Sequence, residues 1–245
     1  ITAEMYRYPS YAAFLQSLSE AEIAGLFDSL KEQYGRDIFG QGYLYKIVDD
    51  CEIANVDSLT DDEKENGIET TKPYYVPYDK GDKDGNRWYL ETPFAIAWSK
   101  ENVRFLKTNS GKKGEGMPVV RNPQFYFREG FCWNNLLNPN ARLLKVKLKG
   151  ESVNDVGSMS LYTTNILSNK YIVALLNSNI LFDYYREFIN CSVNVQINDI
   201  KQLPIIIPTK SLAFSIELWA DKAIKKKQES ANENLEPIEV EIEDL

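Results

Sequence analysis

The stretch RWYLETPFAIAW, Arg87–Trp98, sets the fold class of this chain. It holds two short runs of aromatic and aliphatic residues that are separated by a threonine and Pro93. Runs of this length and composition, bounded by turn residues, are typical of β-strands. Similar runs follow at QFYFRE (Gln124–Glu129) and RLLKVKL (Arg142–Leu148), between clusters of Gly, Pro and Asn. The middle of the chain therefore predicts a mostly antiparallel β region with long loops.

The N-terminal part carries patterns of both kinds. Tyr11–Lys31 spaces its apolar residues as one helix face does, and Ser19 is placed to cap a second helix within it. The alternating segment Gly42–Val48 (GYLYKIV) predicts a strand. Leu59–Gly67 predicts one capped helical turn, because Thr60 stands at the N-cap with a glutamate three residues on.

The last third changes character again. Lys170–Ile189 predicts one long helix, and Ser211–Gln228 predicts another. Between them, Ser192–Ile197 (SVNVQI) predicts a strand, and Leu203–Pro208 (LPIIIP) predicts a fully buried one. We expect the acidic tail beyond Glu229 to be loosely ordered. The expected fold is α+β: N-terminal helices, a central mostly antiparallel β region with long loops, and a C-terminal helix–strand–strand–helix.

Composition places the chain among ordinary globular proteins, with 245 residues, 43% hydrophobic and 26% charged. No apolar run approaches the ~18–20 residues of a membrane-spanning helix. The first residues, ITAEMYRYPS, lack the pattern of a signal peptide. We interpret the chain as a fragment of a larger cytoplasmic protein, with a reducing environment for its three cysteines.

Charge is distributed unevenly along the chain. Residues 1–71 have a net charge of -10, residues 72–149 of +8 and residues 150–245 of -6, which together give the total of -8. A basic region within an acidic chain can attract a polyanion, because the local field and not the total charge acts on a ligand. The alternative is a solvated surface that pairs with the acidic thirds.

Signals for catalysis are weak. The sequence has no histidine, and Cys51, Cys132 and Cys191 are too scattered for a zinc site or a disulfide framework. The tetrapeptide NPQF, Asn122–Phe125, approaches the Asn-Pro-Pro-aromatic loop of amino-methyltransferases, but Gln124 replaces the second proline. We find neither a Walker A loop nor a methyltransferase cofactor loop. We therefore expect no catalytic residue and no metal site, although carboxylates cannot be paired from sequence.

Three loops of the basic region combine cations with aromatic or amide side chains. Arginine fits guanine bidentately, Asn and Gln fit adenine, and lysine mostly holds phosphate. Aromatic rings can stack on bases or pack in the core. The candidate DNA-binding residues are Lys80, Lys83, Arg87 and Trp88 in the first loop, Lys107, Lys112 and Lys113 in the second, and Arg121, Asn122, Gln124 and Arg128 in the third.

Four segments carry a family resemblance: YVPYDKGDKDGNRWYLE, RNPQFYFREGFCW, DVGSMSLY and KYIVALLNSNILFDYYREFINCSVNVQINDIKQLPIIIP. They resemble the C-terminal specificity region of N6-adenine DNA methyltransferases, in particular type IIG restriction–modification enzymes and the TaqI-like specificity domain. The resemblance covers roughly Phe39 to Leu245. It implies a helical connector at 1–38, a target-recognition domain at 39–208, and a C-terminal helix with an acidic tail at 209–245.

The resemblance also implies a function. It predicts sequence-specific recognition of duplex DNA for a restriction–modification or phage-defence adenine methyltransferase, without membrane association. The partner would be a methyltransferase domain of the same chain or complex, which would hold S-adenosylmethionine; the fragment itself would hold no cofactor. Three alternatives stay open: a type I DNA-specificity subunit, a small nucleic-acid enzyme with an unrecognised carboxylate site, and a protein–protein interaction module.

Overall fold

The computed structural model describes residues 17–22, 25–26, 29, 45–81, 86–91, 93–113, 118–155, 157–164, 166–230 and 232–245. The chain divides into two compact units, each made of three segments. The first unit takes the chain up to Lys80 together with Thr92–Arg128 and Glu151–Val156, and the second unit takes Gly81–Glu91, Glu129–Gly150 and Gly157–Leu245. The predicted domain limits at 38/39 and 208/209 stay predictions.

The first unit contains a small mixed sheet. Its strands are β1 (Tyr45–Lys46), β2 (Tyr75–Asp79), β3 (Ala95–Ala97) and β6 (Val153–Asn154), in the order β1-β3-β2-β6. β3 runs antiparallel to both of its neighbours, whereas β6 runs parallel to β2. The strands predicted in FAIAW and in GYLYKIV are therefore confirmed at β3 and β1, although residues 42–44 of the second lie outside the described part.

The first unit also contains short helices: η2 (Asp50–Glu52), η3 (Val56–Ser58), α3 (Asp61–Asn66), α4 (Lys100–Asn109) and η4 (Pro123–Phe125). The predicted capped turn is α3: the Thr60 hydroxyl accepts from the Glu63 N–H, and the Glu63 carboxylate accepts from the Thr60 N–H. Helix α4 was not predicted. Its signals were present, however, because Ser99 caps it and its buried residues Val103 and Leu106 are three apart.

The predicted strand QFYFRE is wrong. Asn122 has a left-handed backbone with φ 50°, Pro123 opens the 3-10 helix η4, and Phe127 again has a positive φ of 55°. These turns bury the neighbouring rings of Tyr126 and Phe127 together, with the Trp98 ring edge-on to both at centroid distances of 6.1 and 5.4 Å. An alternating strand would place consecutive side chains on opposite faces. Burial of both rings in one core therefore explains the irregular backbone.

The second unit contains an antiparallel sheet of β4 (Gly130–Asn134), β5 (Lys147–Lys149) and β7 (Ser158–Leu161), in the order β5-β4-β7. Only the end of the predicted run RLLKVKL is a strand. The run RWYLE forms no regular strand; Trp88 makes an isolated bridge to Lys147.

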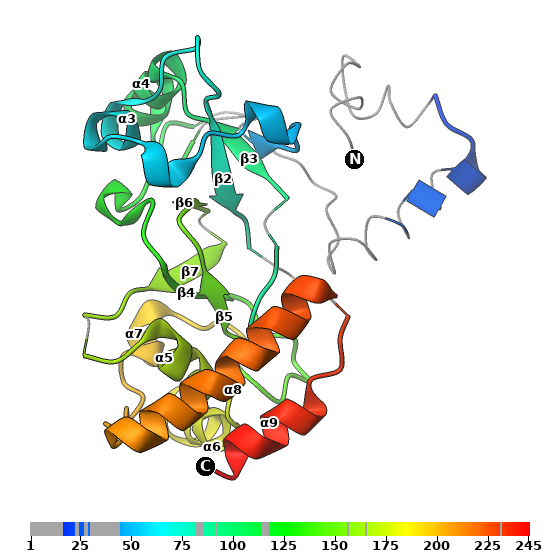
Figure 1. The fold of residues 1–245 in the computed structure, drawn as a ribbon, viewed down its shortest axis with the longest axis vertical. Helices are drawn as coiled ribbons and strands as arrows, with labels where there is room; N and C mark the ends of the chain where they lie inside the picture. The colour runs from blue at the N-terminus through cyan, green and yellow to red at the C-terminus, as the bar shows by residue number, and fades with distance from the viewer. Residues whose placement is uncertain are drawn as a thin grey trace. The chain divides into compact units, whose positions relative to one another are not determined.

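Helices cover the rest of the second unit: α5 (Asn169–Leu176), α6 (Asn179–Tyr184), the π-helical turn η5 (Tyr185–Ile189), α7 (Ile197–Ile200), α8 (Lys210–Glu229) and α9 (Glu236–Glu243). Helix α8 confirms the prediction for Ser211–Gln228, and it lies alongside α5 and α9 (Figure 1). The single helix predicted over Lys170–Ile189 is wrong, because the helix is interrupted after Leu176.

The interruption has a visible cause. The Asn177 side chain accepts from the Val146 N–H and donates to the Val146 carbonyl, both at 2.8 Å. The next residue, Ser178, caps α6. A buried amide that pairs with both backbone groups of one residue fixes the chain at this position, so a new helix begins with its own cap.

Three further predictions are corrected in the C-terminal part. SVNVQI contributes only an isolated bridge, between Asn194 and Leu136, and then enters α7. LPIIIP is a loop rather than a buried strand: Leu203 is buried, but residues 204–207 are exposed, and Pro204 and Pro208 cannot donate to a sheet. The acidic tail forms α9, which buries Ile238 against the core.

The N-terminal helix prediction falls mostly outside the described residues. Within them, Glu20–Glu22 is helical, and Ser19 forms the predicted cap, in which its N–H and hydroxyl donate to the Glu22 carboxylate. Across the described ranges, no helix combines the length and apolar character that crossing a membrane requires.

Candidate nucleic-acid interface

The second and third predicted loops meet in the first unit. The Val120 N–H donates to the Ser110 hydroxyl at 2.9 Å, and the Gly111 N–H donates to the Pro118 carbonyl at 2.9 Å. These bonds join the end of α4 to the segment that leads into η4. Lys112, Lys113 and Arg121 each lie within two residues of this junction, so three predicted cations gather at the base of one loop.

The cations at this junction, the loop-base cluster, are exposed. The Lys112 ammonium donates to the Asn109 side chain, whereas Lys113 and Arg121 form no hydrogen bond or ion pair with the described residues. Arg104, on α4, is likewise exposed and unpaired within that part of the chain. It was missed because α4 itself was not predicted. Exposed and unpaired cations are the kind that can exchange counterions for phosphates.

The remaining residues of the third loop flank this cluster. Asn122 and Gln124 are exposed at the start of η4, and the left-handed Asn122 backbone turns the chain there. Arg128 is exposed and places its guanidinium 5.5 Å from the Phe125 ring centroid, a cation–π arrangement. The third loop therefore presents amide and guanidinium groups close to the lysines of the second.

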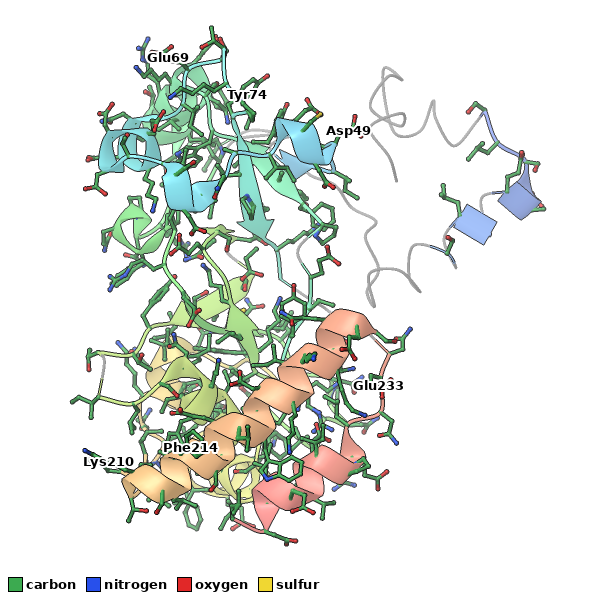
Figure 2. The ribbon with its side chains drawn as sticks, in the orientation of Figure 1. Asp49, Glu69, Tyr74, Lys210, Phe214 and Glu233 are labelled. Carbon is green, nitrogen blue, oxygen red and sulfur yellow. The ribbon has the colours of Figure 1, made fainter. Side chains whose placement is uncertain are left out.

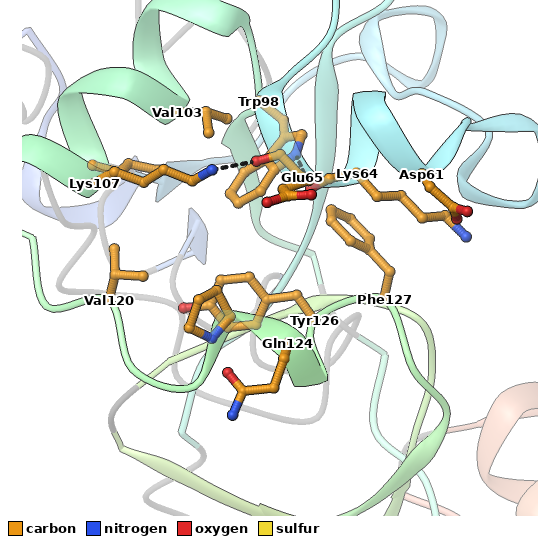
Figure 3. A pocket seen from close by; sticks show the side chains of 12 residues that line it. Asp61, Lys64, Glu65, Trp98, Val103, Lys107, Val120, Gln124, Tyr126 and Phe127 are labelled. Atoms are coloured by element: carbon orange, nitrogen blue, oxygen red, sulfur yellow. Dashed lines mark hydrogen bonds between the residues drawn. The ribbon is translucent and has the colours of Figure 1, made fainter.

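A cavity of about 430 Å³ opens beside the loop-base cluster. Figure 3 shows Trp98 and Glu65 on one side of it and Tyr126 and Gln124 on the other. The cavity is lined by Asp61, Lys64, Glu65, Trp98, Val103, Leu106, Lys107, Val120, Pro123, Gln124, Tyr126 and Phe127. Its walls are mostly apolar and its rim is polar, which is the composition of small-ligand sites in proteins.

Lys107 has a structural role at this rim. Its ammonium donates to the Glu65 carbonyl at 2.8 Å, at the C-terminal end of α3 (Figure 3). A cation there stabilises the helix end. By contrast, the Asp61 and Glu65 carboxylates and the Gln124 amide make no hydrogen bond or ion pair with the residues described. Three hydrogen-bonding side chains at the rim are therefore available to a ligand.

The first predicted loop is occupied by internal contacts. The Lys80 ammonium donates to the Tyr45 hydroxyl and lies 4.7 Å from the Tyr45 ring centroid. In the second unit, Arg87 pairs with Glu239, whose carboxylate also accepts from the Trp88 indole at 2.7 Å. Trp88 is 2% exposed, so it has no free face for stacking on a base.

Lys80, Arg87 and Trp88 therefore do not join the candidate interface. Lys83 lies outside the described residues. Two further lysines of the basic region, Lys147 and Lys149, are buried in the second unit. Part of the positive charge in residues 72–149 thus belongs to the interior and not to an exposed surface.

Two acid-x-lysine triplets, Asp62–Lys64 and Asp199–Lys201, have a spacing found in metal-dependent nucleases. Both acids hold local structure instead. Asp62 accepts from the Asn66 amide at 2.8 Å, and Asp199 accepts from the Gln196 N–H at 2.9 Å in the cap of α7. Among the described residues, no group of three or more Cys, Asp or Glu side chains is placed to hold a metal ion.

Comparisons of the chain with models of known protein families and with characterised proteins gave no match.

Proposed function

We propose that this chain recognises duplex DNA in a sequence-specific manner, as the specificity region of a restriction–modification or phage-defence adenine methyltransferase. The observation that carries the proposal is the loop-base cluster. Lys112, Lys113 and Arg121 lie at one hydrogen-bonded junction, with Asn122 and Gln124 directly beside them. The cluster combines cations for phosphates with amides and an arginine for base edges.

The two kinds of group have different tasks. The lysines contact phosphates, which fixes the position of the protein on the duplex without reading sequence. Arg121, Asn122 and Gln124 reach the base edges, because bidentate groups distinguish bases in the major groove. Lys80, Arg87 and Trp88, which are engaged within the protein, take no part.

The second unit offers a surface suited to the methyltransferase domain. Large apolar side chains are exposed on α8 and on the loop before it, and Phe214 stands on the N-terminal half of α8 (Figure 2). The exposed residues are Ile205, Ile206, Ile207, Phe214 and Leu218. Apolar side chains gathered on a surface are typical of sites that another protein surface covers. In this role the protein works in the cytoplasm, in contact with DNA and with a domain that binds S-adenosylmethionine.

A titration of labelled duplex DNA at several salt concentrations tests the proposal. If the five exposed cations in and next to the loop-base cluster, Arg104, Lys112, Lys113, Arg121 and Arg128, all contacted phosphates, the slope of log K against log salt would be about -4.5, at about -0.9 for each contact. We expect a slope steeper than about -2, and enrichment of one sequence when the chain selects from random duplexes.

Other outcomes separate the alternatives. Binding without salt dependence, or none at all, would reject DNA recognition and favour a protein–protein module. Mg²⁺-dependent nicking by the isolated chain would indicate a complete nucleic-acid enzyme. A type I specificity subunit would also bind DNA. It would assemble with separate methyltransferase chains, whereas the proposed specificity region would belong to the same chain as its methyltransferase domain.

A further inference from the structure

We propose that the cavity of the first unit receives one unpaired nucleobase, with a preference for bases that carry an exocyclic amino group. The inference rests on the proposed DNA recognition and adds a ligand site to it. It assigns a function to Asp61, Glu65 and Trp98, which the sequence did not indicate.

The cavity has the size and walls that a flat heteroaromatic ring requires. Its volume of about 430 Å³ lies within the ~300–1,000 Å³ of small-ligand sites. The rings of Trp98, Tyr126 and Phe127 contribute to its walls, and Val103 and Leu106 add aliphatic surface. An unpaired base that enters such a site exchanges water for apolar contacts, as extruded bases do in proteins that bind them.

The rim favours a ligand that donates hydrogen bonds. The Asp61 and Glu65 carboxylates can only accept when ionised, and the Gln124 carbonyl also accepts. None of the three groups has a partner in the described part of the chain. Adenine and cytosine each present an amino group, whereas thymine presents none. The rim therefore favours an unpaired adenine or cytosine over thymine.

The two lysines of the lining face acceptors of the protein itself: Lys107 donates to the Glu65 carbonyl, and the Lys64 ammonium lies 3.9 Å from the Glu151 carboxylate. Val120 and Pro123 line the cavity and directly flank Arg121 and Asn122 in the chain. The hydrogen bonds between Ser110 and Val120 hold the chain that carries Lys112 and Lys113 next to this segment. Phosphates next to the unpaired base can thus contact the loop-base cluster outside while the base lies inside.

The test compares duplexes that differ only in one unpaired nucleotide. Fluorescence anisotropy would measure binding of the 245-residue chain to a fully paired duplex and to the same duplex with one extra adenine, cytosine or thymine. We expect the unpaired adenine and cytosine duplexes to bind at least about fivefold more tightly than the paired and thymine duplexes, since stacking of one base on a protein has an effect of this order.

Matched variants show whether the preference for an unpaired adenine or cytosine arises in the cavity. Val120→Trp fills the cavity and Glu65→Ala removes a rim acceptor, so each should abolish the preference while binding to paired duplex stays within about twofold. Val119→Trp, on an exposed residue that does not line the cavity, is the control and should keep the preference. Thermal melting would show that each variant is folded, and Glu65, being exposed, can be changed with little risk to the fold.

The outcomes distinguish this inference from the proposed function. Equal affinity for adenine and thymine duplexes, or a preference that survives both Val120→Trp and Glu65→Ala, would overturn the base site while leaving DNA recognition in place. Absence of binding to every duplex would overturn both.

Discussion

Glu239 offers the sharpest test of the structural role of the first predicted loop. Its carboxylate, 16% exposed, accepts from Arg87 and from the Trp88 indole at 2.7 Å. Replacing it by alanine leaves the indole N–H without its acceptor in a side chain that is 2% exposed. A hydrogen bond to a charged group contributes about 1.5–3 kcal/mol. The Arg87 side chain is 31% exposed, so solvent screening reduces the contribution of the Arg87–Glu239 ion pair to stability to under about 1 kcal/mol.

We therefore expect Glu239→Ala to lower the free energy of unfolding by about 2–3 kcal/mol. With a urea dependence of about 1–3 kcal/mol/M, the midpoint of the transition that reports on the second unit should fall by roughly 1–2 M. Tryptophan fluorescence during urea denaturation measures this midpoint. Glu241→Ala is the control, because Glu241 lies on the same helix, exposed and without a partner in the described residues.

Equal midpoints for Glu239→Ala and Glu241→Ala would refute the reasoning, since the pairing of Trp88 would then contribute nothing. A second measurement, on Arg87→Ala, distinguishes a structural role of Arg87 from a role in DNA binding. Arg87→Ala should lower the same midpoint by less than Glu239→Ala does, and should leave the salt slope of DNA binding unchanged. If the slope instead falls by about 0.9, Arg87 contacts a phosphate and its pairing with Glu239 is not maintained.

Four further predictions concern individual side chains. Lys113→Ala should reduce the salt slope of duplex binding by about 0.9 and weaken binding to all sequences equally, as measured by titration at four salt concentrations; a change confined to one sequence would contradict a phosphate contact. Tyr185→Phe should be neutral or stabilising by up to about 1 kcal/mol, because the buried Tyr185 hydroxyl has no hydrogen-bond partner in the described ranges. Tyr171→Phe should instead destabilise by about 0.5–1.5 kcal/mol in chemical denaturation, since its hydroxyl donates to a backbone carbonyl at 2.9 Å. The Lys72 ammonium, together with the N–H and hydroxyl of Thr60, holds the pKa of Glu63 at about 2, below its ordinary 4.5, so the stability from these contacts is complete above pH 4.5 and is lost as the pH falls toward 2. Thermal melts between pH 5 and pH 2.5 should therefore show a smaller loss in Lys72→Ala than in the unmodified chain, and equal losses would count against the pairing.

Local sequence signals were enough for several elements. The box of Thr60 and Glu63 predicted α3, and the apolar spacing of Ser211–Gln228 predicted α8, because caps and helix faces depend on residues a few positions apart. The alternating FAIAW likewise predicted β3. The same kind of signal marked the basic loops, so Lys112, Lys113 and Arg121 could be proposed from sequence.

Tertiary contacts decided the elements that local patterns missed. The buried amide of Asn177 interrupts a helix that the apolar pattern alone would continue. The acidic tail forms α9 because Ile238 packs in the core and the Glu239 carboxylate accepts hydrogen bonds from Arg87 and Trp88, about 150 positions earlier in the chain.

The sequence by itself determined the α+β class, the main helix caps and the uneven charge. Only the tertiary structure decided which cations are exposed, as Lys113 is, and which are engaged, as Arg87 is. It also formed the cavity, whose lining extends from Asp61 to Phe127 across three separate segments. The physical reason is the same in each case: burial and pairing depend on partners that are distant in sequence, and no local pattern encodes the distance between them.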